Sequence, residues 1–219
     1  MDALTFRTED GLRLEGELRV DGVARGSAVI CHPHPLHGGS KDHPVLWALR
    51  IELARRGFAV LTFNFRGVMG SEGSHGGGIP ECNDARAAIG RVREESQGPT
   101  LVCGWSFGAS VALREAIGDE RVGALGLLGF PLASSLPLEM PPLPEPAELG
   151  RFGRPVLFVS GDADPYSPVS ELRELAGRFD DATVEIMTDT DHFFPKRERE
   201  AAALVGAFAE RRLFERFDR

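Results

Sequence analysis

Short runs of apolar residues, many of them β-branched, alternate along the chain with longer segments whose apolar positions recur at helical spacing. The nearly all-apolar runs are typical of buried strands and cover residues 27–31, 59–64, 100–104, 122–128, 155–160 and 183–187. Helical spacing predicts helices over residues 43–56, 81–95, 107–117, 169–178 and 196–213. Because strands and helices alternate, we expect an α/β fold with a mostly parallel, doubly wound sheet between helices.

Two segments depart from this alternation. At the N-terminus, residues 3–8 and 12–20 flank the turn residues Asp10 and Gly11, and the second run alternates apolar and polar positions. This pattern predicts an antiparallel hairpin at the edge of the sheet. Residues 130–153 contain six prolines and show no sustained helical or strand period. We expect a long loop there in place of a cap domain, and one domain spanning residues 1–219.

Composition narrows the classes of partner and the cellular compartment. The chain has 219 residues and a formal net charge of −8, and no basic cluster offsets this charge. We therefore expect neither nucleic acid nor an anionic membrane as a partner. Residues 1–20 lack an apolar run, so we expect no signal peptide or membrane span, and a cytoplasmic location. An odd number of cysteines without a Cys-x-x-Cys pair predicts reduced thiols at Cys31, Cys82 and Cys103.

A candidate nucleophile lies between the predicted strand 100–104 and the predicted helix 107–117. The segment Gly104-Trp105-Ser106-Phe107-Gly108 has the Gly-x-Ser-x-Gly pattern, in which a serine occupies a sharp strand-to-helix turn. The glycines avoid clashes around the strained backbone, and the hydroxyl projects from the carboxyl end of the sheet. Backbone N–H groups and the positive end of the helix dipole can meet an oxyanion there. We expect Ser106 to be a catalytic nucleophile.

A serine hydroxyl needs a base to take its proton, and histidine suits this task near neutral pH. His192 is the only histidine after Ser106, and it lies between the last predicted strand and the last predicted helix. The alternative is an ordinary solvent-exposed loop histidine. The segment Gly161-Asp162-Ala163-Asp164-Pro165 supplies two candidate carboxylates to orient the base. We favour Asp164, because the proline after it fixes the departing chain, and expect Asp162 to form the turn.

These residues together resemble the α/β-hydrolase superfamily, and the resemblance covers nearly the entire chain. Residues 31–40, Cys-His-Pro-His-Pro-Leu-His-Gly-Gly-Ser, are similar to the oxyanion loop of small, cap-less predicted bacterial hydrolases. The resemblance implies that the N–H of Phe107 and one N–H of this loop bind the oxyanion. Prolines cannot donate, which leaves His34 or Leu36, and we favour Leu36. We expect His34, His37 and Trp105 to contact the substrate.

A second similar stretch covers residues 64–73, Asn-Phe-Arg-Gly-Val-Met-Gly-Ser-Glu-Gly, and resembles the arginine-glycine segment of many α/β-hydrolases. The resemblance implies an architectural role. The usual pattern has glycine where Met69 stands, so this turn departs from the family.

His32, His34 and His37 also form a His-x-His-x-x-His cluster of the kind that can hold a metal. We disfavour this alternative, because the nearest carboxylate is Asp42 and the intervening prolines restrict how the rings converge. We expect no metal and no cofactor.

The constellation predicts acyl transfer to water by a serine hydrolase, with a carboxylesterase or thioesterase as the favoured activity. Six apolar residues of the Pro-rich segment are expected to form a rim that favours small to medium acyl esters: Phe130, Pro131, Leu132, Leu136, Leu138 and Met140. A serine peptidase or acyltransferase would use the same triad. From another class, an inactive ligand-binding module could share the fold, but it would be expected to lack a triad residue.

Overall fold

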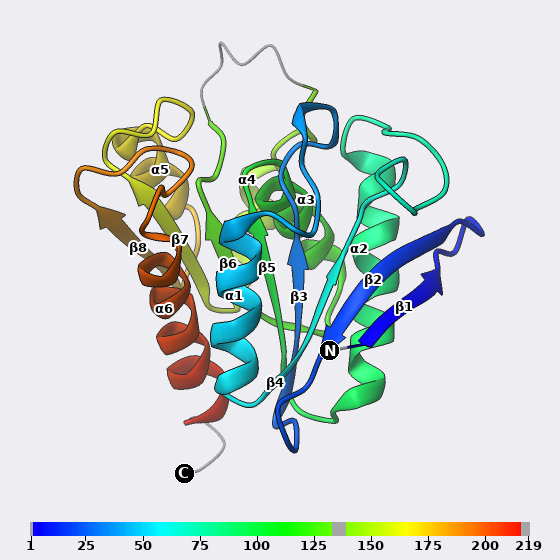
Figure 1. Ribbon diagram of the computed structural model, residues 1–219. Helices are drawn as coiled ribbons and strands as arrows, with labels where there is room; N and C mark the ends of the chain where they lie inside the picture. Colours follow the sequence, from blue (N-terminus) through cyan, green and yellow to red (C-terminus); the bar gives the residue numbers. More distant parts are fainter. Residues whose placement is uncertain (1, 133–138, 216–219) are drawn as a thin grey trace.

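The computed structural model describes residues 2–132 and 139–215, and its strands form one eight-stranded sheet (Figure 1). The strand order is β1-β2-β4-β3-β5-β6-β7-β8. The strands are β1 (Asp2–Arg7), β2 (Arg13–Arg19), β3 (Gly26–Cys31), β4 (Phe58–Phe63), β5 (Thr100–Trp105), β6 (Val122–Leu128), β7 (Val156–Gly161) and β8 (Ala182–Met187).

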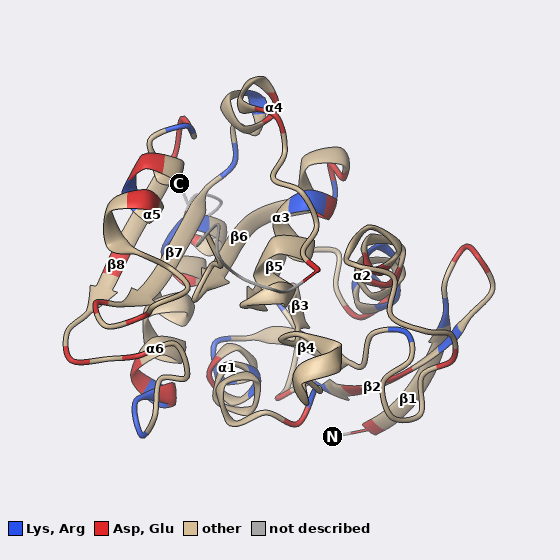
Figure 2. Cartoon of the chain, turned by 90° about the horizontal axis from the view of Figure 1, so that it is seen from above, with Lys and Arg blue, Asp and Glu red and all other residues tan. Residues whose placement is uncertain are grey.

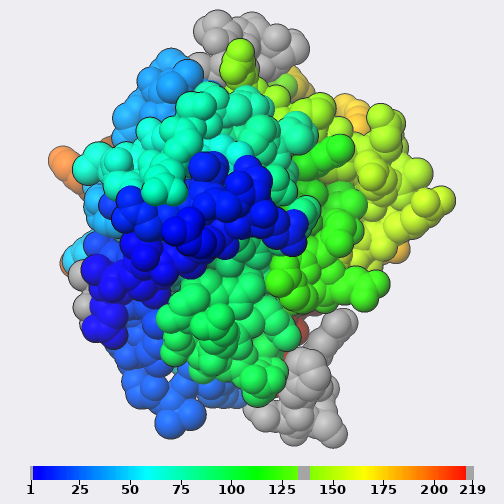
Figure 3. All heavy atoms as spheres, turned by 90° about the vertical axis from the view of Figure 1, so that its right-hand side faces the viewer, coloured from blue at the N-terminus to red at the C-terminus, as the bar shows by residue number. Residues whose placement is uncertain are grey.

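The N-terminal hairpin is present at the edge of this sheet, as predicted. β1 pairs with β2 in antiparallel register, and β2 pairs antiparallel with β4. From β4 to β8 every neighbouring pair of strands is parallel. Figure 3 shows the hairpin, in dark blue, on one side of the molecule, where β1 packs against α2. The mostly parallel, doubly wound sheet is therefore confirmed.

Helices cover both faces of the sheet (Figure 1). They are α1 (Pro44–Arg55), α2 (Ile79–Val92), α3 (Phe107–Gly118), α4 (Pro146–Arg151), α5 (Val169–Ala176) and α6 (Glu198–Ala209). Apolar residues of α1 and α6 share one buried cluster with the sheet, and those of α2, α3 and α5 share the other. These two clusters explain the all-apolar strands, because each central strand buries side chains on both faces.

One element corrects the sequence prediction. The Pro-rich segment 130–153 was expected to be a loop, yet it contains the short helix α4. Glu145 caps this helix. Its N–H donates a hydrogen bond to the Glu148 carboxylate, and Pro146 occupies the first helical position. A helix of six residues is too short to show a periodic apolar pattern, and the prolines masked it.

The arginine-glycine segment ties the hairpin and α2 to the end of β4. Arg66 is almost fully buried and forms a two-pronged ion pair with Asp84 of α2, and it also pairs with Asp10 of the hairpin turn. Met69 adopts a left-handed backbone conformation, with φ of 50°. Methionine therefore occupies a conformation that favours glycine, which is the residue of the usual family pattern at this position.

The three cysteines are free and buried, as predicted. Positions of both signs of charge are interspersed along the helices, the connecting loops and the N-terminal hairpin (Figure 2). Among the described residues, no helix has both the length and the apolar character needed to cross a membrane.

Candidate active site

The segment around Ser106 forms the sharp strand-to-helix turn that its glycines predict. Ser106 has φ of 55° and ψ of −122° and directly precedes the first residue of α3. A Cβ atom at Gly104 would lie 2.2 Å from the carbonyl oxygen of Gly108. A Cβ atom at Gly108 would lie 2.3 Å from the carbonyl oxygen of Cys31. Both positions therefore require glycine, and the strained serine is held between β5 and α3 by this close backbone packing.

Asp164 and His192 lie together at the carboxyl end of the sheet. Asp164 Oδ2 is 2.8 Å from His192 Nδ1, and both side chains are buried. Asp164 Oδ1 accepts hydrogen bonds from the N–H groups of Tyr166 and Ser167, at 2.9 and 3.2 Å. Asp162 is exposed, and its carboxylate accepts a long 3.4 Å bond from the Thr190 N–H. Of the two candidate carboxylates, Asp164 is the one that contacts the imidazole.

The ring of His192 is also supported from its other sides. The indole N–H of Trp105 donates to the carbonyl oxygen of His192 at 3.1 Å. The Tyr166 ring packs edge-on against the imidazole, with ring centroids 4.8 Å apart. Gly129 has φ of 49°, and a Cβ atom there would lie 3.1 Å from the imidazole. The ring therefore has little freedom to turn away from Asp164.

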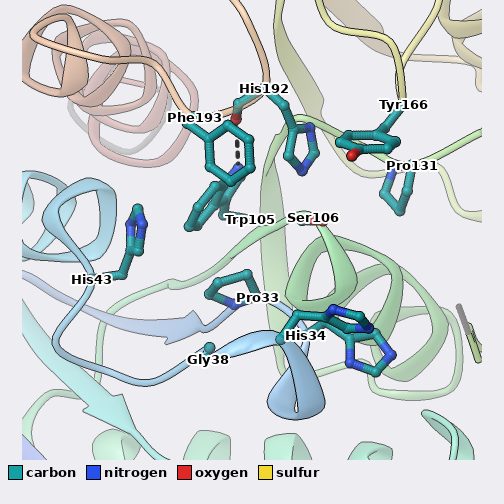
Figure 4. A pocket seen from close by; sticks show the side chains of 12 residues that line it. Pro33, His34, Gly38, His43, Trp105, Ser106, Pro131, Tyr166, His192 and Phe193 are labelled. Carbon is teal, nitrogen blue, oxygen red and sulfur yellow. Dashed lines mark hydrogen bonds between the residues drawn. The ribbon is translucent and has the colours of Figure 1, made fainter.

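Ser106 and His192 open into the same pocket of about 460 Å³ (Figure 4). The pocket is lined by Pro33, His34, His37, Gly38, Gly39, His43, Trp105, Ser106, Pro131, Tyr166, His192 and Phe193. Among the described residues the Ser106 hydroxyl makes no hydrogen bond. Such contacts are often long in a ligand-free site and tighten when substrate binds.

All three predicted substrate contacts, His34, His37 and Trp105, line this pocket. The sequence prediction missed His43, Tyr166 and Phe193 as pocket residues. Tyr166 and Phe193 stand close in sequence to Asp164 and His192, which was the only available signal for them. His43 precedes Pro44 at the start of a helix. That position indicates a helix-capping residue and gives no signal of a ligand contact.

The geometry does not favour Leu36 as the oxyanion donor, because its N–H already has an acceptor and its side chain lies outside the pocket. Residues Pro35–His37 form a single 3-10 turn, in which the Leu36 N–H donates to the Nδ1 atom of His34 at 3.2 Å. Leu36 is 69% exposed and does not line the pocket. His34, the alternative donor, does line it, and its backbone N–H has no acceptor among the described residues. The N–H of Phe107 likewise has no acceptor there.

The three loop histidines do not converge as metal ligands. The buried His32 ring turns away from the other two: its Nε2 accepts the Phe65 N–H at 3.0 Å, and its Nδ1 lies 2.6 Å from the Pro33 carbonyl oxygen. Burial lowers the pKa of His32 to about 4, so the ring is neutral near pH 7. Within the described residues, no group of three or more His, Cys, Asp or Glu side chains is arranged to hold a metal ion.

The His34 ring joins the loop of residues 31–40 to the Pro-rich segment. Its Nδ1 accepts from Leu36, so its Nε2 carries the proton and donates to the Glu139 carbonyl oxygen at 3.1 Å. Burial lowers the pKa of His34, and the neighbouring His75 and His37 act in the same direction. His75 in turn lies 2.9 Å from the buried carboxylate of Glu81. A neutral His34 therefore shapes one wall of the pocket.

The apolar rim expected from residues 130–140 is only partly present. Pro131 lines the pocket, but Phe130 is buried in the core against Phe158. Leu132 and Met140 pack against the same core cluster. Leu136 and Leu138 lie outside the described residues. The chain after β6 turns inward, and this cannot be seen from composition.

Comparisons with known proteins show the family and the fold. The chain matches the family described as an alpha/beta hydrolase domain over residues 28–211. It is 28% identical to the solved structure of an alpha-beta serine hydrolase homologue from Coxiella burnetii, with a TM-score of 0.81 and coverage of 94% of this chain and 96% of that chain. It is also 28% identical to an α/β serine hydrolase without lid from Xanthomonas campestris, with a TM-score of 0.79 and coverage of 97% and 95%.

A relative known from its sequence shows a similar degree of likeness. An uncharacterised protein of Rickettsia prowazekii (strain Madrid E) is 27% identical over 217 residues, which cover 95% of this chain and 88% of the relative.

Proposed function

We propose that this chain, which belongs to the alpha/beta hydrolase domain family, is a serine hydrolase that cleaves small to medium acyl esters through an acyl-enzyme on Ser106. One observation carries the proposal. A serine on a strained strand-to-helix turn opens into the same pocket as a histidine whose far nitrogen is bonded to a buried carboxylate. This arrangement supplies a nucleophile, its base and the group that orients the base.

The hydrogen bond to Asp164 fixes the tautomer of His192. With the Nδ1 proton donated to Asp164 Oδ2, the Nε2 lone pair is free to take the proton of the Ser106 hydroxyl. As Ser106 Oγ bonds to the ester carbonyl carbon, the proton passes to His192 and the carbonyl oxygen becomes an oxyanion. Collapse of this intermediate breaks the bond to the alcohol oxygen, which leaves with the proton from His192.

Water then completes the cycle. His192 takes a proton from water as the water oxygen attacks the acyl carbon and forms a second oxyanion. This intermediate collapses to release the carboxylic acid, and His192 returns the proton to Ser106 Oγ. Asp164 remains ionised throughout and stabilises the positive charge that forms on the imidazole in each half-reaction.

We propose that two backbone amides bind the oxyanion. The N–H of Phe107 is the first of α3, where the helix dipole also favours negative charge, and it has no acceptor among the described residues. The N–H of His34 has none there either, and His34 lines the pocket beside Ser106. We therefore assign His34, and no longer Leu36, as the second donor.

Thioesters and activated amides would react through the same steps, and an alcohol in place of water would give an acyltransferase. The small-ester assignment rests on a pocket of about 460 Å³ with mostly ring-bearing walls and no charged Lys, Arg, Asp or Glu side chain among its lining residues. An inactive binding module is disfavoured, because Ser106, Asp164 and His192 are all present.

Steady-state hydrolysis of acetate, butanoate and octanoate esters of one alcohol tests the proposal. We expect turnover by the wild-type protein, and a loss of about six orders of magnitude in kcat for Ser106→Ala and for His192→Ala. Hydrolysis that survives unchanged in folded Ser106→Ala would contradict the proposal. Thioesters and amides of the same acids, and added alcohol acceptors, separate the alternative activities.

A further inference from the structure

His43 lies in the pocket but has no part in the proposed chemistry. It is the residue before α1, and its Nδ1 accepts the N–H of Val45 at 3.3 Å, which caps the helix. A nitrogen that accepts a hydrogen bond cannot carry the ring proton of a neutral imidazole, so the proton is on Nε2. Nε2 has no acceptor among the described residues. His43 thus presents an unused hydrogen-bond donor on the pocket side of a helix cap.

The position of this donor relative to Ser106 is fixed by ring packing. The His43 imidazole lies against the Trp105 indole, with ring centroids 4.1 Å apart. Trp105 directly precedes Ser106 and is anchored by its hydrogen bond to the His192 carbonyl oxygen. His43 is therefore held rigidly by a residue that adjoins both the nucleophile and its base (Figure 4).

The donor is neutral near pH 7. Burial lowers the pKa of His43, and the carboxylate of Glu198 acts in the opposite direction with a smaller effect. A neutral imidazole N–H recognises an uncharged oxygen acceptor, such as a hydroxyl or carbonyl oxygen, without needing an anion.

The wall around this donor is aromatic. Phe193 stands edge-on to Trp105, with ring centroids 6.0 Å apart, and it is 54% exposed at the mouth of the pocket. In Figure 4, His43, Trp105 and Phe193 lie on one side of Ser106, and Tyr166 and Pro131 lie on the other. The pocket thus has two sides, and the side that ends at His43 offers flat ring surfaces of the kind on which another ring packs well.

We propose that His43 is a specificity-determining residue: its Nε2–H binds an oxygen acceptor on an aromatic substituent of the ester, whose ring lies against Trp105 and Phe193. The preferred substrates are then esters that carry an aromatic ring, in the acyl or the alcohol half, with a hydroxyl or similar oxygen remote from the scissile bond. The inference rests on the proposed esterase function, and it adds the substrate class and a residue that selects it.

The test compares two pairs of esters. Methyl benzoate and methyl 4-hydroxybenzoate place the ring in the acyl half, and phenyl acetate and 4-hydroxyphenyl acetate place it in the alcohol half. For each pair, the ratio of kcat/KM with and without the hydroxyl is measured in wild type, His43→Phe and His43→Asn. His43→Phe keeps a ring without the donor, and His43→Asn keeps a capping side chain without the ring. Intrinsic differences in ester reactivity cancel when ratios are compared between proteins.

We expect the ratio to fall by about threefold to tenfold in both variants for one of the two pairs, which corresponds to one neutral hydrogen bond. The pair that responds identifies the half of the ester bound on the His43 side. Asp42→Asn is the matched control, because Asp42 adjoins His43 in the chain but does not line the pocket, and it should retain the wild-type ratio. Ratios that are the same in wild type and both His43 variants for both pairs would overturn the inference.

Binding separates this inference from the proposed function. Benzamide and 4-hydroxybenzamide are uncharged analogues whose affinities can be measured by NMR titration whether or not the protein hydrolyses esters. If no ester is cleaved, the proposed function fails, and the binding pair alone decides the role of His43. A preference for the hydroxylated amide that is lost in His43→Phe supports the inference, and equal affinities in wild type contradict it.

Discussion

Asp164 Oδ2 and His192 Nδ1 lie 2.8 Å apart in the interior, while the second oxygen of Asp164 is held by two backbone N–H groups of the following turn. The carboxylate is therefore oriented before it meets the imidazole. Pro165 and the turn that leads to α5 hold Asp164 at this site. Asp162, two residues earlier, is exposed at the surface. This difference between two aspartates separated by one residue gives the first prediction.

Asp164→Asn should lower kcat for ester hydrolysis by about four orders of magnitude, because the amide can donate to Nδ1 and stabilises the wrong imidazole tautomer. Asp162→Asn is the matched control and should change kcat by less than about threefold, since the exposed Asp162 carboxylate accepts a long 3.4 Å hydrogen bond from the Thr190 N–H and does not contact the imidazole. Steady-state kinetics on one ester would check both variants. A larger loss in Asp162→Asn would reverse the assignment of the acid.

Gly39→Ala should lower kcat by about two to three orders of magnitude while the protein remains folded. A Cβ atom at Gly39 would lie 2.1 Å from the Pro33 carbonyl oxygen, and this oxygen belongs to the same planar peptide unit as the His34 N–H. Relief of the clash must move the His34 N–H away from the oxyanion. Loss of one oxyanion donor typically lowers kcat by about two to three orders of magnitude.

The control for Gly39→Ala is Gly118→Ala, where an added Cβ would meet nothing within 4 Å. It should leave kcat unchanged. Circular dichroism and thermal unfolding would show whether the Gly39 variant is folded. Wild-type kcat in folded Gly39→Ala would count against the His34 N–H as an oxyanion donor.

The free energy of unfolding should fall as pH decreases from about 6.5 towards 4. The pKa of His32 is lowered to about 4 by burial, so between these pH values the unfolded chain binds a proton at His32 that the folded protein does not. This one group should remove about 3 kcal/mol of stability over that range. His34 and His43, whose pKa values burial also lowers, should add to the loss.

His32→Gln tests this assignment, because glutamine does not titrate. Urea unfolding at pH 7 and at pH 4 gives, for each protein, the free energy of unfolding that is lost between these two pH values. This loss should be smaller by about 3 kcal/mol in the variant than in the wild type, whatever the absolute stability of the variant. An identical pH dependence in the two proteins would show that His32 is not responsible.

Met69→Gly should stabilise the protein by about 0.5 to 1 kcal/mol. The left-handed conformation at Met69 costs a side chain with a Cβ atom about 1 to 2 kcal/mol, and the greater flexibility of unfolded glycine offsets part of the gain. The Met69 side chain is 77% exposed, so little packing is lost. Chemical unfolding would measure the change. Met69→Ala keeps the Cβ and should show no such gain, so equal stabilisation by both variants would refute the strain argument.

The strands and most helices could be predicted from the sequence because each central strand is buried on both faces and therefore all apolar. β6 has the predicted bounds, and β3, β4, β5, β7 and β8 differ from the prediction by one residue at one or both ends. α4 could not be seen in the same way. Its capping residues Glu145, Pro146 and Glu148 were visible signals, but six helical residues carry no period.

The site was predictable where a local pattern dictates geometry and not where loops meet only in space. Ser106 and Asp164 stand in turns whose glycine and proline neighbours mark them. The choice between His34 and Leu36 as the second oxyanion donor depends on the orientation of the His34 ring, because its Nδ1 accepts the hydrogen bond of the Leu36 N–H. His43 lies far from Trp105 in the sequence, and only the fold brings its ring against the Trp105 indole in the pocket.

The central claim is that Ser106 is an activated nucleophile, and covalent labelling with a fluorophosphonate probe tests it most directly. Wild-type protein, Ser106→Ala and denatured wild type are each treated with the probe, and the adduct is located by peptide mass mapping. The account predicts one phosphonyl group per chain, on Ser106, in the folded wild type alone. Labelling at another residue, or none in folded wild type, would contradict it.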